Sequence, residues 1–520
     1  MIGAAIRRDP GITYPEYPYS PNEKYPELCS MPRGKSDIDS SNMVYGLFRD
    51  LLVDLECDIE NYGTSSWNPL GNLVSPGDTV IIKPNLVRDM EGRQDCVTTH
   101  PSVIRPIIDY VLLALDGKGS IIVGDAPTAE ARFEIFQHEM GYQKLVDLYA
   151  DAPVPVALRD FRALKTIGDD GIWTGVQENS SSEMPEHTIV DLGENSIFCI
   201  EDCENGRFHG GGYEIDDTIS HHHGKVHEYC VSKDILEADV VISVPKLKTH
   251  KKAGITCCLK NLVGINCDKN YLPHFMMGPV NHGGDEMPEL KSWNAMVMRA
   301  YNHIRQAIIG KHWMSLGKPA AAFLNLVSRS NKQEQDAASK AADSAETNQL
   351  SDQKDLGQWL HSKLSGQPIA AGSWMGNQTI CRMILDLNQI ALRSNQEGTI
   401  DEGPQHRKLF YVVDGIVAGA GNGPTSAIPV HAGILAAGYN GLQVDASVLY
   451  ALGINPWSVP LYDKARKYSW MHPESDFADV LVDGHSLQAG EYSDIEFKEP
   501  DGWSYEKLPQ GAEVAPLERK

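Results

Sequence analysis

Residues 233–265 read KDILEADVVISVPKLKTHKKAGITCCLKNLVGI. Residues 233–238 fit a short helix, and the β-branched run after them is typical of a buried strand. A polar loop is expected over residues 244–254, and Gly254 with Thr256 is expected to open a second helix. Helix, strand, loop and helix in this order indicate an α/β protein with a parallel sheet.

The same alternation occurs on both sides of this stretch. Upstream, helical spacing and short apolar runs predict helix, strand, helix, strand and helix at residues 43–55, 79–87, 100–115, 119–127 and 134–150. Downstream, residues 383–392 predict a helix, 408–424 a strand that feeds a glycine loop, and 441–453 a further strand and helix. The alternation predicts the fold class, α/β, over most of the chain.

We predict two α/β domains with mostly parallel sheets and a ligand cleft at the carboxyl ends of the strands, at residues 41–265 and 373–520. Prolines and tyrosines in residues 1–40 predict an extended arm that lies on the surface. Residues 266–325 are interpreted as a helical connection. Residues 326–372 are rich in Ser, Gln, Ala and Asp, which predicts a flexible low-complexity insertion.

Composition limits the classes of partner. The 520 residues carry 46 Lys and Arg against 70 Asp and Glu, a net charge of −24, which disfavours nucleic acid and anionic membranes. No segment has the ~18 apolar residues of a membrane span, and the first residues lack a signal-peptide stretch, so a cytosolic protein is expected. The ten cysteines show no disulfide or iron–sulfur spacing, so reduced thiols are expected.

The polar loop of the opening stretch is the main candidate site. Residues 246–252 hold four lysines and His250, and such a cluster favours a phosphate, carboxylate or polyhydroxy-anion ligand. Lys260 and Asn261 follow on the expected helix, whose N-terminus would add affinity for an anion. A solvated basic loop without a ligand is the alternative.

Other predicted strands also end in polar residues. Lys83 and Asn85 end one strand, Asp125 ends another, and Asp414 begins the glycine loop that contains Gly421, Asn422 and Gly423. Because ligands bind at the carboxyl edge of open α/β sheets, we expect these residues to meet His250 and Lys260 in one pocket of roughly 300 to 1,000 Å³.

Histidines offer candidate metal ligands. His223 and His227 have the i, i+4 spacing that can ligate a metal on one helix face, although Gly224 weakens a helix there. His274 and His282 lie downstream of Lys260 and form a second candidate pair. A polar loop without a metal is the alternative for the first pair.

Several of these motifs occur in collinear order and together resemble the DUF362 protein family. They are Lys83-Pro84-Asn85, Thr99-His100-Pro101, Gly124-Asp125, Lys246-x-Lys248-x-His250, Leu259-Lys260-Asn261-x2-Gly264, Asp414-Gly415 and Gly421-Asn422-Gly423-Pro424. The resemblance covers most of residues 75–460 and adds Thr99 and His100 to the candidate binding residues. Many members carry a ferredoxin-like cluster segment, from which this chain departs, so an iron–sulfur cluster is not expected.

The string His250-x2-Ala253-Gly254-x-Thr256-x3-Lys260 is also similar to a segment of the nickel-pincer lactate racemase family. That resemblance implies His250 as an acid/base group and Lys260 as the attachment point of a nickel-pincer nucleotide. Cys257 and Cys258 replace the paired glycines of that segment, and the earlier strand ends in Asp125 where that family supplies a second base. The likeness is therefore equally compatible with shared fold ancestry alone.

The sequence favours a cytosolic enzyme that performs acid/base chemistry on a small anionic or polyhydroxylated substrate. His250 is the expected base, because neighbouring cations favour its neutral form, and Lys246, Lys248 and Lys260 are expected to hold the anion. Asp125 or Asp414 would orient a hydroxyl group or a divalent metal. A metal-dependent or nickel-pincer isomerase and a non-catalytic anion- or metal-binding protein are the alternatives.

Overall fold

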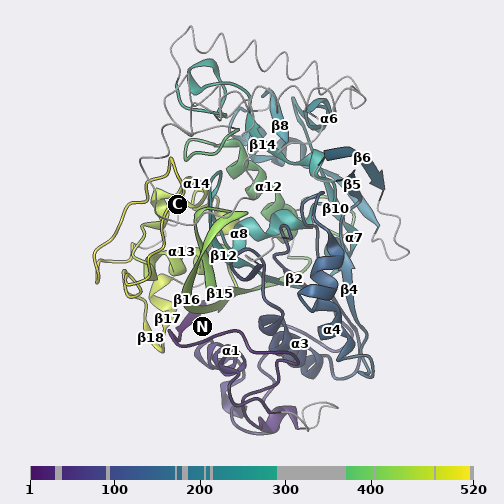
Figure 1. Cartoon of the computed structure of the whole chain (residues 1–520), viewed down its shortest axis with the longest axis vertical. Helices are drawn as coiled ribbons and strands as arrows, with labels where there is room; N and C mark the ends of the chain where they lie inside the picture. Colours follow the sequence, from purple (N-terminus) through teal and green to yellow (C-terminus); the bar gives the residue numbers. More distant parts are fainter. Residues whose placement is uncertain are drawn as a thin grey trace, which may run out of the picture.

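The computed structural model describes residues 2–29, 38–89, 94–169, 172–178, 186–203, 206–210, 215–289, 371–401, 405–473 and 476–515. One large, mostly parallel sheet organises these residues (Figure 1). Its strands run in the order β18-β17-β1-β16-β15-β11-β2-β3-β4. Their bounds are β18 His485–Ser486, β17 Val480–Val482, β1 Ala4–Arg8, β16 Ser426–Gly438, β15 Lys408–Asn422, β11 Val240–Val244, β2 Thr79–Pro84, β3 Ser120–Asp125 and β4 Val156–Asp160.

The centre of the sheet is parallel and buried on both faces. In β2, Val80 and Ile82 pack on one side while Ile81, between them, packs on the other. Continuous β-branched runs are expected in strands that are covered on both faces, which is why the sequence identifies them. The predicted α/β class with mostly parallel strands is confirmed.

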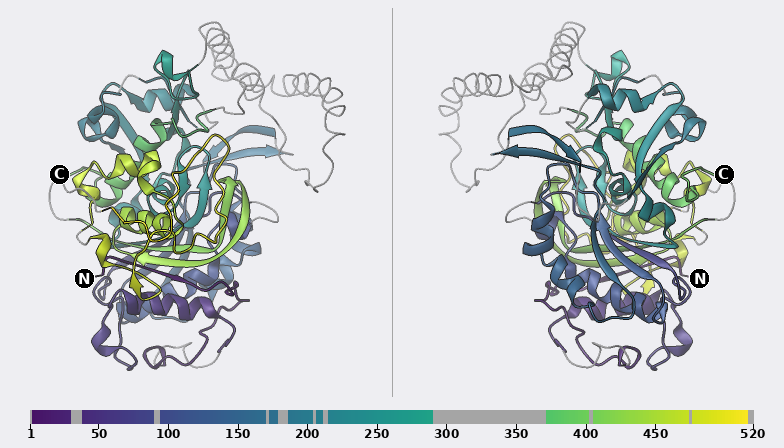
Figure 2. Two further views of the ribbon diagram at one scale, coloured as in Figure 1. Left: turned by 90° about the vertical axis from the view of Figure 1, so that its left-hand side faces the viewer. Right: turned by 90° about the vertical axis from the view of Figure 1, so that its right-hand side faces the viewer.

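Two helical layers cover the sheet. The first layer is α1 (Met43–Asp54), α3 (Pro101–Leu115) and α4 (Tyr142–Asp147), and the second is α8 (Cys258–Asn261), α12 (Thr379–Arg393), α13 (Gly441–Ala451) and α14 (Pro460–Ala465). Figure 2 shows α1 and α3, in purple and blue, across the sheet from the yellow-green α13. The shorter helices are α2 (Gln94–Val97), α5 (Ile197–Ile200), α6 (Ile215–His221) and α7 (Lys233–Glu237).

Strands from both predicted domains join in this one sheet. β15, from residues 373–520, pairs in parallel with β11, from residues 41–265. The N-terminal segment also contributes, because β1 pairs with β16 and β17. The prediction of a surface arm is therefore wrong for Ala4–Arg8, whose first three residues are fully buried. The other predicted boundaries are not tested and stay predictions.

Two predicted loops are strands. Lys246–His250 forms β12, which pairs with β15 and with β13 (Gly254–Thr256), so the expected helix begins only at Cys258. The predicted glycine loop after residue 413 continues β15, which forms a long hairpin with β16. At Gly419 an added Cβ would lie 2.8 Å from the Cβ of Lys248, so glycine here permits close strand pairing rather than a loop.

Residues 441–451 form α13 alone, without the strand expected there. Every side chain of α13 is buried, so its sequence has no polar face and its helical period is hidden.

Smaller sheets lie beside the main one. They are β7 (His187–Asp191) with β10 (Val226–Ser232) and β9 (His222–His223), β8 (Phe208–Gly210) with β14 (Pro273–Met276), and β5 (Leu164–Asp169) with β6 (Ile172–Glu178). Residues 290–370 lie outside the described residues, and with them most of the predicted helical connection and insertion. No helix in the described part of the chain is long and apolar enough to cross a membrane.

Candidate functional site

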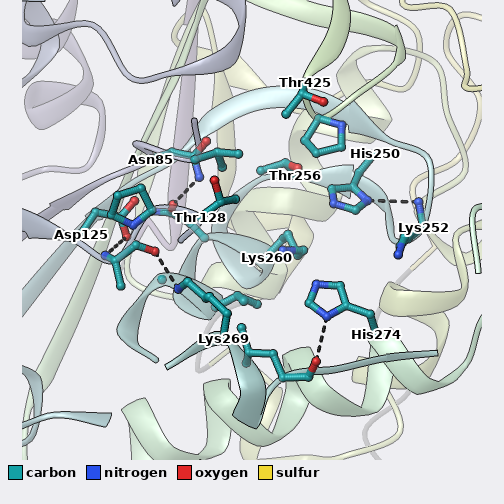
Figure 3. A pocket seen from close by; sticks show the side chains of 18 of the residues that line it. Asn85, Asp125, Thr128, His250, Lys252, Thr256, Lys260, Lys269, His274 and Thr425 are labelled. Carbon is teal, nitrogen blue, oxygen red and sulfur yellow. Dashed lines mark hydrogen bonds between the residues drawn. The ribbon is translucent and has the colours of Figure 1, made fainter. Parts of the chain in front are cut away.

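A cavity of about 250 Å³ lies at the carboxyl ends of β2 and β3, where the sequence predicts a cleft. Strand ends, the turn after β12, helix α8 and strand β14 surround it (Figure 3). Its polar lining residues are Lys83, Asn85, Asp125, Thr128, Glu130, His250, Lys251, Lys252, Thr256, Lys260, Asn261, Lys269, His274 and Thr425. The volume is slightly below the ~300 to 1,000 Å³ typical of ligand pockets.

A buried ion pair forms one wall of the cavity. Lys83 Nζ lies 2.7 Å from Asp125 Oδ1 at the ends of two neighbouring parallel strands. Asp125 also accepts hydrogen bonds from the backbone N–H groups of Leu86 and Ala126. Gly264 leaves room for this pair, because a Cβ there would lie 2.0 Å from Asp125 Oδ1. The pair therefore depends on a glycine from the segment that follows α8.

An amide network continues from this wall. Lys248 Nζ donates to Asn85 Oδ1 at 2.7 Å, and Asn85 Nδ2 donates to Asn261 Oδ1 at 3.0 Å. Asn261 in turn donates to the carbonyl of Lys83 and to Ser243 Oγ, which ties α8 to the ends of β2 and β11. This network fixes the position of the helix that carries Lys260.

The backbone fixes the tautomer of His250. Its Nδ1 accepts hydrogen bonds from the N–H groups of Lys252 and Ala253, both at 3.1 Å. Burial, followed by the charges of Lys260 and Lys252, holds the pKa of His250 well below its usual value. The imidazole is therefore neutral with its proton on Nε2, and Nε2–H is a hydrogen-bond donor.

His274 has the opposite tautomer. Its Nδ1 lies 2.8 Å from the carbonyl oxygen of Leu272, so Nδ1 carries the proton and donates it (Figure 3). Burial, with the charge of Lys252, also holds the pKa of His274 well below its usual value. Nε2 is therefore an unprotonated acceptor. The cavity thus contains one neutral histidine that donates and one that accepts.

Cations outnumber anions around the cavity. Five lysines line it against two carboxylates, Asp125 and Glu130. Burial and the charges of Lys269 and Lys83 lower the pKa of Lys260 to about 7, and burial lowers that of Lys269 to about 8. The amino group of Lys269 donates to the carbonyls of Ala126 and Asn266. An anion in the cavity would offset this excess positive charge.

Lys246 and Asp414, both predicted in the site, lie outside the cavity lining. Lys246 Nζ contacts Asp414 Oδ2 at 2.6 Å, and both side chains are completely buried. Tyr14 from the N-terminal segment donates to Asp414 Oδ1 at 2.7 Å and accepts from Lys246 at 2.6 Å. We name Tyr14, His100, Lys246 and Asp414 the closed network. The Lys246 ammonium and the Asp414 carboxylate neutralise each other and both are hydrogen-bonded to Tyr14, so we do not expect them to bind a ligand.

Thr99 and His100 also have partners away from the cavity. Thr99 Oγ1 donates to the carbonyl of Val244, and the His100 side chain caps α3. The backbone N–H of His100 donates to Asp414 Oδ2 at 2.9 Å, and its ring stacks on Tyr14 at 4.1 Å. These contacts place both residues in the supporting structure.

The glycine segment lies beside the cavity but does not line it. Gly421 and Gly423 accept hydrogen bonds from Thr249 Oγ1 and from the backbone of Lys251, and Asn422 pairs with Asp501. The next residues, Pro424 and Thr425, reach the cavity.

The predicted metal pairs are not assembled. His223 and His227 lie on the hairpin β9–β10 rather than on one helix face, and the register pairs His227 with His222. His223 is exposed while His227 is buried. His282 is exposed and does not line the cavity, so His274 is the member of the second pair that reaches it.

Lys269, Thr128 and Arg162 contribute to the cavity although no motif in the sequence points to them. Arg162 Nη1 donates to the carbonyls of Thr128, Ala129 and Ala131 and so shapes the loop that lines one side of the cavity. Lys269 lies in a stretch without a recognisable pattern. No sequence signal identifies these residues, because their role depends on contacts over long sequence separations.

The sequence profile of the family described as a domain of unknown function, DUF362, matches residues 80–168 and 166–450. The chain belongs to the DUF362 family. All residues that line the cavity fall within the matched DUF362 stretches.

One curated relative is the thylakoid-associated protein sll1697 of Synechocystis sp., 27% identical over 195 residues. That match covers 38% of this DUF362 chain and 41% of the relative, so the chain spans about two fifths of the relative's length. A crystal structure of a Thermotoga maritima protein aligns over 45% of this chain and 40% of its own, with 13% identity and a TM-score of 0.22.

Proposed function

We propose that this DUF362 protein is an enzyme that binds a small carboxylate or phosphate compound in the cavity. The enzyme would remove a proton from this substrate or add one to it. The observation that carries the proposal is that His250 and His274 line the same cavity as neutral histidines with opposite tautomers, beside a surplus of lysines. Such a pair can accept a proton from one atom of a substrate and donate a hydrogen bond to another.

The proposed roles of His250 and His274 differ from those expected from the sequence. His274 Nε2 is the acceptor and hence the base, whereas His250 Nε2–H stabilises developing negative charge as a donor. His250 can act as a base only if Nδ1 takes the proton, which would break its two bonds from the backbone. Lys260 and Lys252 hold the anionic group, and Asp125 positions Lys83.

Two measurements test this proposal. Titration calorimetry with inorganic phosphate and with lactate should detect binding, and Lys118→Met, an exposed site outside the cavity, should leave it unchanged. Proton abstraction next to a carboxylate exchanges carbon-bound hydrogen, which NMR detects in D₂O. With a panel of 2-hydroxy and 2-oxo acids, His274→Gln should slow exchange by ~10²- to 10⁴-fold. Phosphate binding without exchange of carbon-bound hydrogen would instead support a non-catalytic anion-binding protein.

The nickel-pincer alternative fits the cavity less well. A nucleotide cofactor needs more room than about 250 Å³, and the buried thiols of Cys257 and Cys258 stand where the similar segment has glycines. Metal analysis and intact mass of the purified protein decide between the two. Stoichiometric nickel or a covalent mass on Lys260 would overturn the small-anion proposal, and another bound divalent ion would indicate a metal-dependent isomerase or a metal-binding protein.

A cytosolic location remains part of the proposal. The net charge of −24 disfavours attachment to anionic membranes, whereas the curated relative is named as thylakoid-associated. Cell fractionation with an antibody against this chain would show which compartment holds it.

A further inference from the structure

The amino group of Lys260 differs from those of the lysines that are tied to the cavity walls. Lys83 pairs with Asp125, and Lys269 donates to two carbonyls. Lys260, a partly buried residue of α8, lines the cavity, and its Nζ has no hydrogen-bond or ion-pair partner among the described residues. A lysine held at a cavity without a carboxylate partner is available to react.

The surroundings of Lys260 favour its neutral form. Burial and the nearby charges of Lys269 and Lys83 lower its pKa to about 7, so the free amine is populated near neutral pH. Only the free amine has the lone pair that attacks carbon. Figure 3 shows Lys260 among the labelled cavity residues, with His250 and His274 nearby.

We infer that Lys260 forms an imine with a small carbonyl compound that also carries a carboxylate or phosphate. The inference rests on the proposed anion-binding function and names its substrate class, a 2-oxo acid or a phosphorylated ketone. In this complex Lys252 keeps its contact with the anionic group and Lys251, which lines the same cavity, takes over the contact that Lys260 makes with an anion that has no carbonyl group. The volume of about 250 Å³ suits a ligand of this size.

His250 and His274 supply the hydrogen-bond donor and the proton acceptor that imine formation requires. The Lys260 lone pair attacks the carbonyl carbon, a C–N bond forms, and the carbonyl π electrons move to oxygen, which accepts the hydrogen bond from His250 Nε2–H. A proton leaves the nitrogen for His274 Nε2 and passes to that oxygen. In the resulting carbinolamine, the second nitrogen proton passes through His274 Nε2 to the same oxygen, the nitrogen lone pair forms the C=N bond as the C–O bond breaks, and water leaves, so that a neutral imine remains. No oxidant or reductant is needed.

Borohydride trapping tests the inference on the full-length protein. Sodium borohydride reduces an imine to a stable secondary amine, so incubation with pyruvate or dihydroxyacetone phosphate should leave a covalent mass, which peptide mapping should place on Lys260. Lys118→Met should trap as much adduct as wild type. Lys260→Arg keeps the positive charge but cannot form the imine, so it should lose at least nine tenths of the adduct.

The outcomes separate the two claims. If phosphate binds and neither carbonyl probe gives an adduct on Lys260, the imine is wrong and the anion-binding proposal stands. If phosphate does not bind and no adduct forms, both fail. An adduct that persists in Lys260→Arg, or that maps to Lys251, would also overturn the assignment. Loss of adduct in Lys260→Arg with phosphate binding retained would support both claims.

Discussion

Lys246 in the closed network and Lys260 at the cavity differ in whether the amino group has a partner. In the closed network, Lys246 contacts Asp414 and Tyr14, and Asp414 also accepts the backbone N–H of His100. In the cavity, Lys260 has no such partner among the described residues. Lys246 and Lys260 are only 14 residues apart in the sequence, so local composition does not distinguish them.

An ion-pair partner, rather than a position near the sheet edge, therefore distinguishes a structural lysine from a chemically available one. A buried ion pair whose members are mutually satisfied fixes a geometry, and removal of one member leaves an uncompensated charge. An unpaired lysine keeps its capacity to bind or react and contributes little to stability. Substitutions in the two regions should therefore give opposite phenotypes.

The largest effect is expected from Asp414→Asn. It leaves the Lys246 ammonium buried without a counter-charge, which should lower the free energy of unfolding by about 3 to 5 kcal/mol. Urea denaturation followed by circular dichroism measures this. Adding Lys246→Met should recover part of the loss, because it removes the unpaired charge. A loss below about 1 kcal/mol would show that the pair is not needed.

Lys260→Met should have the contrasting phenotype. Removing one charge-assisted contact should weaken phosphate binding by about 1.5 to 3 kcal/mol, or about 10- to 150-fold. The free energy of unfolding should stay the same or rise, because a partly buried amino group without an ion-pair partner has been removed. Calorimetry and urea denaturation of the same preparation measure both. Destabilisation comparable to that of Asp414→Asn would show that Lys260 has a structural role like that of Lys246.

Tyr14→Phe tests the closed network with a smaller change. The phenol oxygen contacts Asp414, Lys246 and the N–H of Val417, and removing it should lower the free energy of unfolding by about 1 to 2 kcal/mol. Phosphate affinity should not change, because Tyr14 does not line the cavity. A variant with wild-type stability but weaker binding would join the two regions into one site.

The smallest effect concerns pH. Burial lowers the pKa of His100 to about 3, below the ~6.5 of an unfolded chain, so the unfolded state binds a proton first as the pH falls. His100 therefore lowers the stability below pH 6.5, by up to about 1.4 kcal/mol per pH unit until its folded pKa is reached. His100→Asn keeps a helix-capping side chain and should flatten the stability profile between pH 6 and 5 by up to that amount. An unchanged slope would mean that His100 is already protonated in the folded protein.

Much of the fold could be predicted from the sequence, because the β-branched runs of β2, β3 and β11 and the turns after them are local signals. The strand ends also located part of the site, since Lys83, Asp125, His250 and Lys260 do line one cavity. The loop predictions were wrong at β12 and at the end of β15, because these residues pair with distant strands. The prediction of a strand was also wrong at α13, which is buried on all sides.

The amino-acid sequence alone placed Lys83 and Asp125 at the carboxyl ends of β2 and β3, because the β-branched runs of these strands and the turns after them are local signals. The contacts of the site residues follow instead from the folded arrangement of remote segments. Tyr14 meets Asp414 across 400 residues and encloses Lys246, while Gly264 lets Lys83 pair with Asp125. The tautomers of His250 and His274 likewise follow from nearby backbone groups whose positions the fold sets. Charge pairing depends on distance in space, and distances between remote segments exist only once the chain is folded.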